Sequence, residues 1–180
     1  MKSKIIFGYG SLMSKESLLV TAPNATDIRP AYIQGFIRDF SYWDPLGYTE
    51  TNLDLAGIPM CSLNVYATSH NTDRVNGVAF SVDQKDYEAL LIRERGQRPL
   101  STAVYDYRTG KKIGDCVVFA SQECSGSFDF DNPAQVRYLQ VALEAARLLG
   151  DEFYQEVLTT TYIGKKTLSE FPQLLRASVL

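Results

Sequence analysis

The chain has 180 residues and a formal net charge of −3, with 45% apolar and 22% charged residues. These values fit one globular domain that buries enough surface to fold without disulfides or structural metals. The negative net charge and the lack of a long basic run argue against nucleic acid as a partner. No apolar run is long enough to span a bilayer. We therefore expect a small molecule or another protein as the partner, while the oligomeric state is not indicated.

Strand-like runs rich in β-branched and aromatic residues recur over the first two thirds of the chain. They are expected at residues 4–9, 29–40, 60–67, 74–82, 102–107 and 115–121. Residues 108–112, between the last two runs, predict a hairpin link. Residues 43–59 are polar, with glycines and prolines, and are long for a structureless connection, so they are a candidate lid or pocket wall.

Helical patterns are fewer. One covers residues 83–95 and stops at Gly96, a suitable C-terminal cap. A second covers residues 132–150, with proline in its first turn, and a short helix follows at 151–158. Residues 167–170 have the pattern of a capping box. Because strands and helices do not alternate regularly, we predict an α+β fold with helices packed on a mixed or antiparallel sheet, such as a barrel.

The first residues and the cysteines favour a cytoplasmic location. Only three apolar residues follow Lys4, which is too few for the core of a secretory signal. The chain has an odd number of cysteines, namely Cys61, Cys116 and Cys124, and their spacing matches no metal site. Unpaired cysteines of this kind are typical of proteins in a reducing compartment. We expect the three cysteines to be ordinary packing or surface residues.

The stretch Phe7-Gly8-Tyr9-Gly10-Ser11-Leu12-Met13 follows the first predicted strand and is the first candidate for a site. Glycine lets the backbone approach a ligand, or adopt positive φ, without a Cβ clash. Two glycines around a tyrosine, followed by a serine, place several N–H donors and one hydroxyl in a short loop. Such a loop suits an anion or an oxyanion, and a tight strand-to-loop turn explains the same residues equally well.

The second candidate is Glu94. In the predicted helix over residues 83–95, Tyr87, Leu90 and Leu91 form an apolar stripe, and Glu94 occupies the next position of that stripe. Its carboxylate is expected on the core side, where burial raises a carboxyl pKa toward the range of a general base. In the alternative, Glu94 pairs with a neighbouring arginine or lies at a frayed helix end.

Other chemistries find little support in the sequence. The only histidine, His70, lies in a polar loop, so a Ser/His/Asp, Cys/His or zinc site would depend on this one residue. A dinucleotide fingerprint beginning at Gly8 would need its third glycine where Met13 stands, and no phosphate-binding lysine follows the loop. We therefore predict neither a cofactor nor a metal. The remaining residues suit a reaction in which the substrate supplies its own nucleophile, while the protein moves a proton and stabilises an oxyanion.

These residues also resemble the γ-glutamylcyclotransferase-like superfamily, which includes AIG2-like and ChaC-type proteins. The resemblance is strongest from residue 4 to about residue 121. Its motifs are Phe7–Leu12, Gly35–Phe40, Val75–Phe80, the helix end Leu91-Ile92-Arg93-Glu94, and the strand Gly114–Phe119. The resemblance implies a compact mixed β-barrel flanked by helices. It also implies one domain over residues 1–180, with a barrel core at about 4–121 and a C-terminal helical extension at about 131–180.

The resemblance further implies an activity and its residues. Members of the superfamily release 5-oxoproline from a γ-glutamyl amine or amide, as the α-amine of the substrate attacks its own γ-carbonyl. Glu94 matches the acid/base glutamate of the family, and Tyr9, Gly10, Ser11 and Leu12 match the loop that holds the glutamyl group. The implied partner is thus a small γ-glutamyl compound, and no cofactor is needed.

One departure keeps an alternative open. The family often has an aromatic residue shortly after the glutamate, whereas Arg95-Gly96-Gln97-Arg98-Pro99 follows here. The pocket would then accept a different leaving group, or it would bind small molecules without turnover; hydrolysis is a further alternative. Arg38 and Trp43 beside the second strand, and Tyr162 near the C-terminus, are candidates for the pocket wall, although Arg38 alternatively pairs with a surface aspartate.

Overall fold

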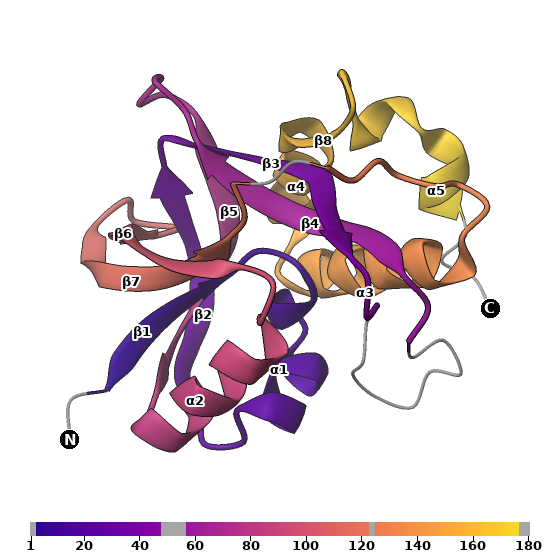
Figure 1. Ribbon diagram of the computed structural model, residues 1–180. Helices are drawn as coiled ribbons and strands as arrows, with labels where there is room; N and C mark the ends of the chain where they lie inside the picture. Colours follow the sequence, from indigo (N-terminus) through magenta and orange to yellow (C-terminus); the bar gives the residue numbers. More distant parts are fainter. Residues whose placement is uncertain (1–2, 48–56, 123–124, 177–180) are drawn as a thin grey trace.

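Five strands close into a barrel at the centre of the protein (Figure 1). The computed structural model describes residues 3–47, 57–122 and 125–176. The barrel order is β1-β5-β2-β6-β7, and its neighbours are antiparallel except β1 and β7, which pair in parallel. The strands are β1 (Lys4–Gly8), β2 (Thr26–Gln34), β5 (Arg74–Val82), β6 (Arg98–Asp106) and β7 (Lys112–Ala120). The predicted α+β barrel is confirmed, and the predicted hairpin link joins β6 to β7.

A second sheet lies beside the barrel, in the order β4-β3-β8-β9. Its strands are β3 (Phe36–Asp44), β4 (Met60–Ala67), β8 (Thr161–Ile163) and β9 (Lys166–Thr167). β3 and β4 form a long antiparallel pair, and β8 joins the other edge of β3 in parallel. The C-terminal segment, expected to be helical, therefore also contributes strands to this sheet.

The predicted strand at residues 29–40 is wrong as a single element. The chain divides at Gly35, which has φ +75, into β2 in the barrel and β3 in the second sheet. Glycine adopts this left-handed backbone without a Cβ clash. The Gly35 N–H donates to the Asp73 carbonyl at 2.7 Å, and the Thr68 N–H donates to the Gly35 carbonyl at 2.8 Å. These two bonds fix the point at which the chain leaves the barrel.

The helices gather in two groups (Figure 1). α1 and α2 lie side by side at one end of the barrel, whereas α3, α4 and α5 lie toward the second sheet. Their bounds are α1 (Lys15–Thr21), α2 (Gln84–Arg93), α3 (Pro133–Leu148), α4 (Asp151–Thr160) and α5 (Pro172–Arg176), with the 3₁₀ helices η1 (Ser11–Met13) and η2 (Leu168–Glu170). In the described part of the chain, no helix combines the length and apolar character needed to cross a membrane.

The sequence predicts the C-terminal helices better than α1. The Asn132 side chain caps α3, accepting from two backbone N–H groups of its first turn, and Gly150 with φ +119 separates α3 from α4. The predicted capping box is present at the start of η2. α1 is an element that the sequence analysis missed, although the Ser14 side chain caps it by accepting from the Ser17 N–H at 3.3 Å.

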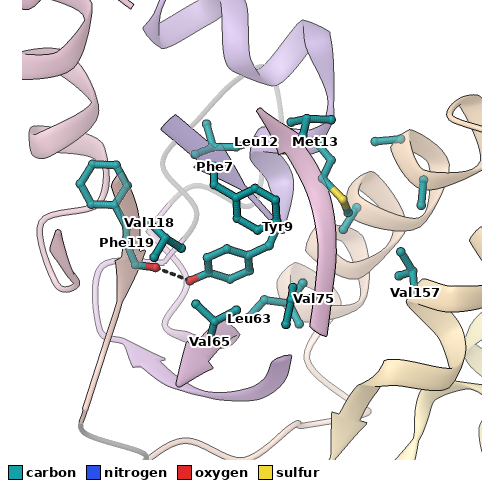
Figure 2. Close-up of a cluster of buried hydrophobic side chains, with 14 of the residues drawn as sticks. Phe7, Tyr9, Leu12, Met13, Leu63, Val65, Val75, Val118, Phe119 and Val157 are labelled. Atoms are coloured by element: carbon teal, nitrogen blue, oxygen red, sulfur yellow. Dashed lines mark hydrogen bonds between the residues drawn. The ribbon is translucent and has the colours of Figure 1, made fainter. Parts of the chain in front are cut away.

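An apolar core fills the space between the barrel and the second sheet (Figure 2). Phe7 and Val118 from barrel strands meet Leu63 and Val65 from β4, and none of the four is more than 4% exposed. Burial of such side chains stabilises the fold by about 1.5–3 kcal/mol each. Tyr9 lies in the same cluster, so the core holds the glycine-rich loop that follows β1.

Candidate functional site

The glycine-rich loop and Glu94 line the same cavity. Its walls come from the β1–η1 loop, the ends of β3 and β4, the α2–β6 link, β7 and α3. All five predicted site residues belong to this wall, namely Tyr9, Gly10, Ser11, Leu12 and Glu94. The fold therefore brings together two features that lie far apart in the sequence.

Close packing explains the two glycines of the loop. A Cβ on Gly8 would lie 2.6 Å from the Leu12 Cβ, and a Cβ on Gly10 would lie 2.6 Å from the Tyr138 hydroxyl oxygen. Neither glycine has a positive φ. The Met13 N–H donates to the Gly10 carbonyl at 2.9 Å and closes the first turn of η1. The tight turn that the sequence analysis expected is confirmed, and this turn also forms a cavity wall.

Tyr9 is held firmly in the cavity wall. Its hydroxyl donates to the Phe119 carbonyl at 2.6 Å (Figure 2) and accepts from the Gln97 side-chain amide at 3.1 Å. Its backbone carbonyl accepts from Arg38 at 3.2 Å. Burial, and secondarily the nearby charge of Glu94, raises the pKa of Tyr9 well above its usual value. Tyr9 is therefore a neutral hydrogen-bonding residue at any physiological pH.

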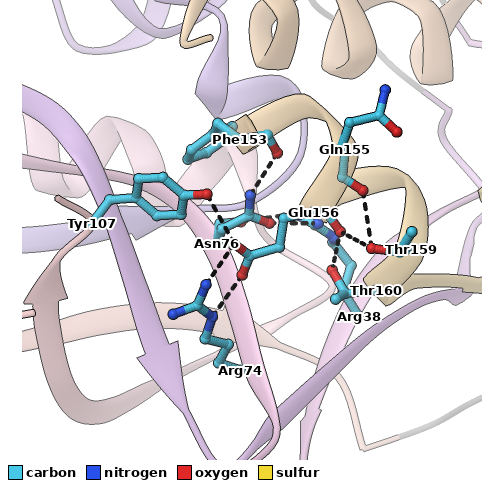
Figure 3. A network of polar contacts seen from close by, with 9 residues as sticks. All are labelled: Arg38, Arg74, Asn76, Tyr107, Phe153, Gln155, Glu156, Thr159 and Thr160. Atoms are coloured by element: carbon cyan, nitrogen blue, oxygen red, sulfur yellow. Dashed lines mark hydrogen bonds and ion pairs between the residues drawn. The ribbon is translucent and has the colours of Figure 1, made fainter. Parts of the chain in front are cut away.

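Arg38 anchors the loop from outside the cavity, and Figure 3 shows it beside Asn76. Its fully buried guanidinium donates to Thr161 Oγ1 at 2.7 Å, to the Asn76 carbonyl at 2.8 Å and to Asn76 Oδ1 at 3.0 Å, besides the Tyr9 carbonyl. Asn76 in turn donates to the Phe153 carbonyl at 2.9 Å. Burial lowers the pKa of Arg38 to about 10. Both predictions for Arg38, a pocket wall and a surface ion pair, are wrong, because its side chain points inward between the two sheets.

Glu94 reaches the cavity from the end of α2. Its N–H donates to the Leu90 carbonyl at 2.9 Å, and Glu94 is the C-cap residue of the helix. Its side chain is 20% exposed, and its Oε1 lies 3.3 Å from Arg93 Nε. The carboxylate thus lines the cavity and also pairs with the adjacent arginine. The apolar stripe that pointed to Glu94 holds only in part, because Leu90 is fully buried while Leu91 is 37% exposed.

The predicted C-terminal cap at Gly96 is wrong. α2 ends at Arg93 with Glu94 as its C-cap, and Gly96 does not have a positive φ. A Cβ on Gly96 would lie 1.3 Å from the Tyr42 hydroxyl oxygen, so glycine is required here for the tyrosine to approach. Gln97, Tyr42 and Tyr138 also line the cavity and were missed. Gln97 belongs to the segment that departs from the family pattern, whereas the two tyrosines, on β3 and α3, carry no local signal.

The polar segment at residues 43–59 contributes to the cavity in part. Asp44 and Gly47 line it, while residues 48–56 lie outside the described part of the chain. Burial raises the pKa of Asp44, and a hydrogen bond from the Leu46 N–H partly opposes this effect. Trp43 is 45% exposed and does not belong to the cavity wall, so its predicted role there is wrong.

Tyr162 borders a separate groove that is lined by residues of β3, β5 and α4. Arg74 and Glu156 share this groove and form a two-point ion pair with distances of 2.7 Å. The Tyr107 hydroxyl donates to the same carboxylate at 2.9 Å (Figure 3). The suggestion that Tyr162 closes the pocket is therefore wrong.

Among the described residues, side chains suited to metal or redox chemistry do not gather in the cavity. The described part of the chain contains no group of three or more His, Cys, Asp or Glu residues that could hold a metal ion, and His70 is exposed. Cys61 and Cys116 are buried free thiols, and burial raises the pKa of each to about 12. They are packing residues, as expected, while Cys124 lies outside the described residues.

Comparison with solved structures identifies the fold. A structure described as a gamma-glutamyl cyclotransferase matches with a TM-score of 0.64 at 18% identity, over 97% of this chain and 99% of that chain. This chain has the γ-glutamylcyclotransferase-like fold. A human protein described as uncharacterized matches with a TM-score of 0.65 at 18% identity, over 97% and 99% of the two chains. A yeast gamma-glutamyl cyclotransferase described as specific to glutathione matches with a TM-score of 0.55 at 14% identity, over 99% and 97%.

The sequence comparisons add no closer relative. No protein-family model matches the chain, and no curated protein sequence matches it at a significant level. At 14–18% identity, the structural matches establish the fold and leave the chemistry to be argued from the cavity itself. The fold that the sequence motifs implied is confirmed.

Proposed function

We propose that the protein is a cofactor-independent γ-glutamylcyclotransferase that forms 5-oxoproline from a γ-glutamyl amine or amide. The observation that supports this most strongly is that the Tyr9–Leu12 loop and Glu94 line one cavity. The fold shared with gamma-glutamyl cyclotransferases supports it further. The sequence resemblance described above, which matches both the loop and Glu94 to motifs of that superfamily, points the same way.

In this reaction the substrate supplies its own nucleophile. The α-amine attacks the γ-carbonyl carbon, a new C–N bond closes the five-membered ring, and the carbonyl oxygen becomes an oxyanion. Glu94 takes a proton from the attacking amine and gives one to the departing amine as the original amide bond breaks. Because the attack is intramolecular, a cavity that holds the glutamyl chain in its folded conformation lowers the entropic part of the barrier.

The loop is proposed to hold the glutamyl group and the oxyanion. Ser11 contributes a hydroxyl to the cavity wall, and Gly10 brings the backbone within reach because it carries no side chain. The N–H groups at the start of a helical turn have no partners within that turn. Donors aimed at a developing oxyanion contribute about 10²–10³-fold each to the rate.

A turnover assay tests this proposal. The protein is incubated with γ-glutamyl amino acids, γ-glutamyl amines and glutathione, and both 5-oxoproline and free glutamate are measured. Glu94→Gln should lower kcat by about 10²–10⁴-fold. Glu88→Gln is a matched control, because Glu88 lies on the same helix and, among the described residues, bonds only to the exposed Gln84 side chain at 2.8 Å. Full activity of Glu94→Gln would refute the assigned role, and free glutamate as the product would identify a hydrolase.

A non-catalytic binding module is the second candidate. The ion pair between Glu94 and Arg93 favours it, since a carboxylate that is already paired is less available to accept a proton. The absence of an aromatic residue shortly after Glu94 points the same way. Calorimetry with γ-glutamyl compounds would then show binding, with no 5-oxoproline or glutamate released from any member of the panel.

A further inference from the structure

Arg93 is a buried guanidinium at the meeting point of three elements next to the cavity. Its side chain is only 6% exposed. Toward α1, Nη1 donates to the Ser17 carbonyl at 2.9 Å and Thr21 Oγ1 at 3.1 Å, and Nη2 donates to Ser17 Oγ at 2.9 Å. Toward the cavity, Nη2 donates to Ser11 Oγ at 3.0 Å and Nε lies 3.3 Å from Glu94 Oε1. Four of these contacts are hydrogen bonds from the two Nη groups, and the fifth is an ion pair at Nε.

The contact with Arg93 determines what the Ser11 hydroxyl can do. A hydroxyl has one hydrogen to donate and two lone pairs to accept with. Since Arg93 donates to Ser11 Oγ, one lone pair is already occupied. Among the described residues, no acceptor is found for the hydrogen of Ser11, and this side chain lines the cavity. The hydroxyl is therefore available as a donor to a ligand oxygen.

The charge on Arg93 strengthens this donor. A hydroxyl that accepts a hydrogen bond from a cation is polarised, and its own hydrogen bond to an acceptor becomes stronger. The acceptor that gains most is an oxygen with full or developing negative charge. The same guanidinium contacts Glu94, so the donor and the carboxylate are held at a fixed separation by one rigid planar group.

We infer that Arg93 is a positioning residue that makes Ser11 a hydrogen-bond donor to a negatively charged ligand oxygen and holds Glu94 beside it. This inference rests on the proposed function for the identity of that oxygen, which is the oxyanion or a carboxylate of a γ-glutamyl compound. Arg93 also lines the cavity, and its proposed role is exerted through its contacts with Ser11 and Glu94.

A double-mutant cycle tests the inference. Ser11→Ala and Arg93→Gln are each expected to lower kcat/KM for 5-oxoproline formation by about 10–100-fold, the range for hydrogen bonds to charged groups. If Arg93 acts through Ser11, the double variant should be no more than about threefold worse than the poorer single variant. The same cycle is measured on the affinity for 5-oxoproline by calorimetry. If the loss in the double variant equals the product of the two single losses, in both kcat/KM and the affinity for 5-oxoproline, the inference is overturned.

Ser17→Ala is the matched control. It removes a contact of the same Arg93 nitrogen on the side away from the cavity. It should lower the melting temperature while kcat and KM stay within about twofold of wild type. Arg93→Lys keeps the charge without the planar fork and should show an intermediate loss. If Arg93→Gln does not fold, the cycle is run with Arg93→Lys, in which the same coupling to Ser11 is expected.

The outcomes separate this inference from the proposed function. Turnover by the wild type, without coupling between Arg93 and Ser11, would overturn the role of Arg93 alone. Coupling in 5-oxoproline affinity, without turnover, would overturn the proposed activity alone. Failure of the wild type both to turn over any γ-glutamyl compound and to bind 5-oxoproline would overturn both, because the Ser11 hydroxyl would then meet no such ligand.

Discussion

Replacing Tyr9 by Phe removes one oxygen atom from the core beside the cavity. That oxygen donates to the Phe119 carbonyl at 2.6 Å and accepts from Gln97 at 3.1 Å, and Tyr9 is only 7% exposed. Loss of the hydroxyl leaves a buried carbonyl without this donor, which costs about 1–3 kcal/mol. For a protein of this size, each kcal/mol lowers the melting temperature by about 2–4 °C, so we expect a decrease of about 2–12 °C.

The assay is thermal unfolding with urea unfolding as a second measurement of the free energy. Tyr105→Phe is the matched control. The Tyr105 ring packs on Tyr32 with centroids 5.3 Å apart, and its hydroxyl makes no hydrogen bond among the described residues. This control should change the free energy of unfolding by less than about 0.5 kcal/mol. If Tyr9→Phe is as stable as wild type, the reasoning from the buried hydrogen bond is refuted.

Two further predictions concern buried groups. Arg38→Met should lower the free energy of unfolding, measured in urea, by about 2–6 kcal/mol. At least two buried acceptors lose their donor, and each unsatisfied acceptor costs about 1–3 kcal/mol. Arg74→Met, which breaks an exposed ion pair, should cost less than about 1 kcal/mol, and equal effects of the two variants would contradict this account. In a Cys124→Ser variant at pH 8, Cys61 and Cys116 should react with a thiol reagent only after denaturation, since burial raises the pKa of each to about 12. In the unfolded chain the same thiols ionise at lower pH. The stability that comes from keeping them neutral in the folded protein should therefore be complete below about pH 8.5 and should decrease as the pH rises toward 12. Rapid labelling of the folded protein would contradict both the protection and this pH dependence.

Local sequence patterns predicted most elements of the fold. β4 and β5 have the predicted bounds, and Asn132 starts α3 as its capping chemistry requires. The predicted strand at 29–40 failed because a single glycine, Gly35, redirects the chain from one sheet to the other. Apolar and aromatic residues occur on both sides of Gly35, so strand-like composition alone does not reveal the turn.

The sequence predicted those residues of the candidate site that belong to a recognisable short sequence pattern. The loop around Ser11 and the glutamate at the end of α2 stand out in the sequence and line one cavity in the structure. Tyr42 and Tyr138 complete the wall without any such signal, because their neighbours in the cavity come from distant segments. Arg93 was expected only as a partner for Glu94, and its contact with Ser11 requires α1, η1 and α2 to be packed together.

The sequence by itself determined most of the secondary structure, the glycine-rich loop and the candidate glutamate, because backbone propensity, capping and side-chain periodicity act over a few residues. Only the tertiary structure decided which side chains face the cavity and which lie beneath it. Arg38 carries a charge, and charged side chains are rarely buried, yet closure of the barrel against the second sheet buries it completely under the loop. The direction of the Ser11 hydroxyl likewise depends on a guanidinium from a separate helix, since a hydrogen bond is fixed by its partner in space and not by distance along the chain.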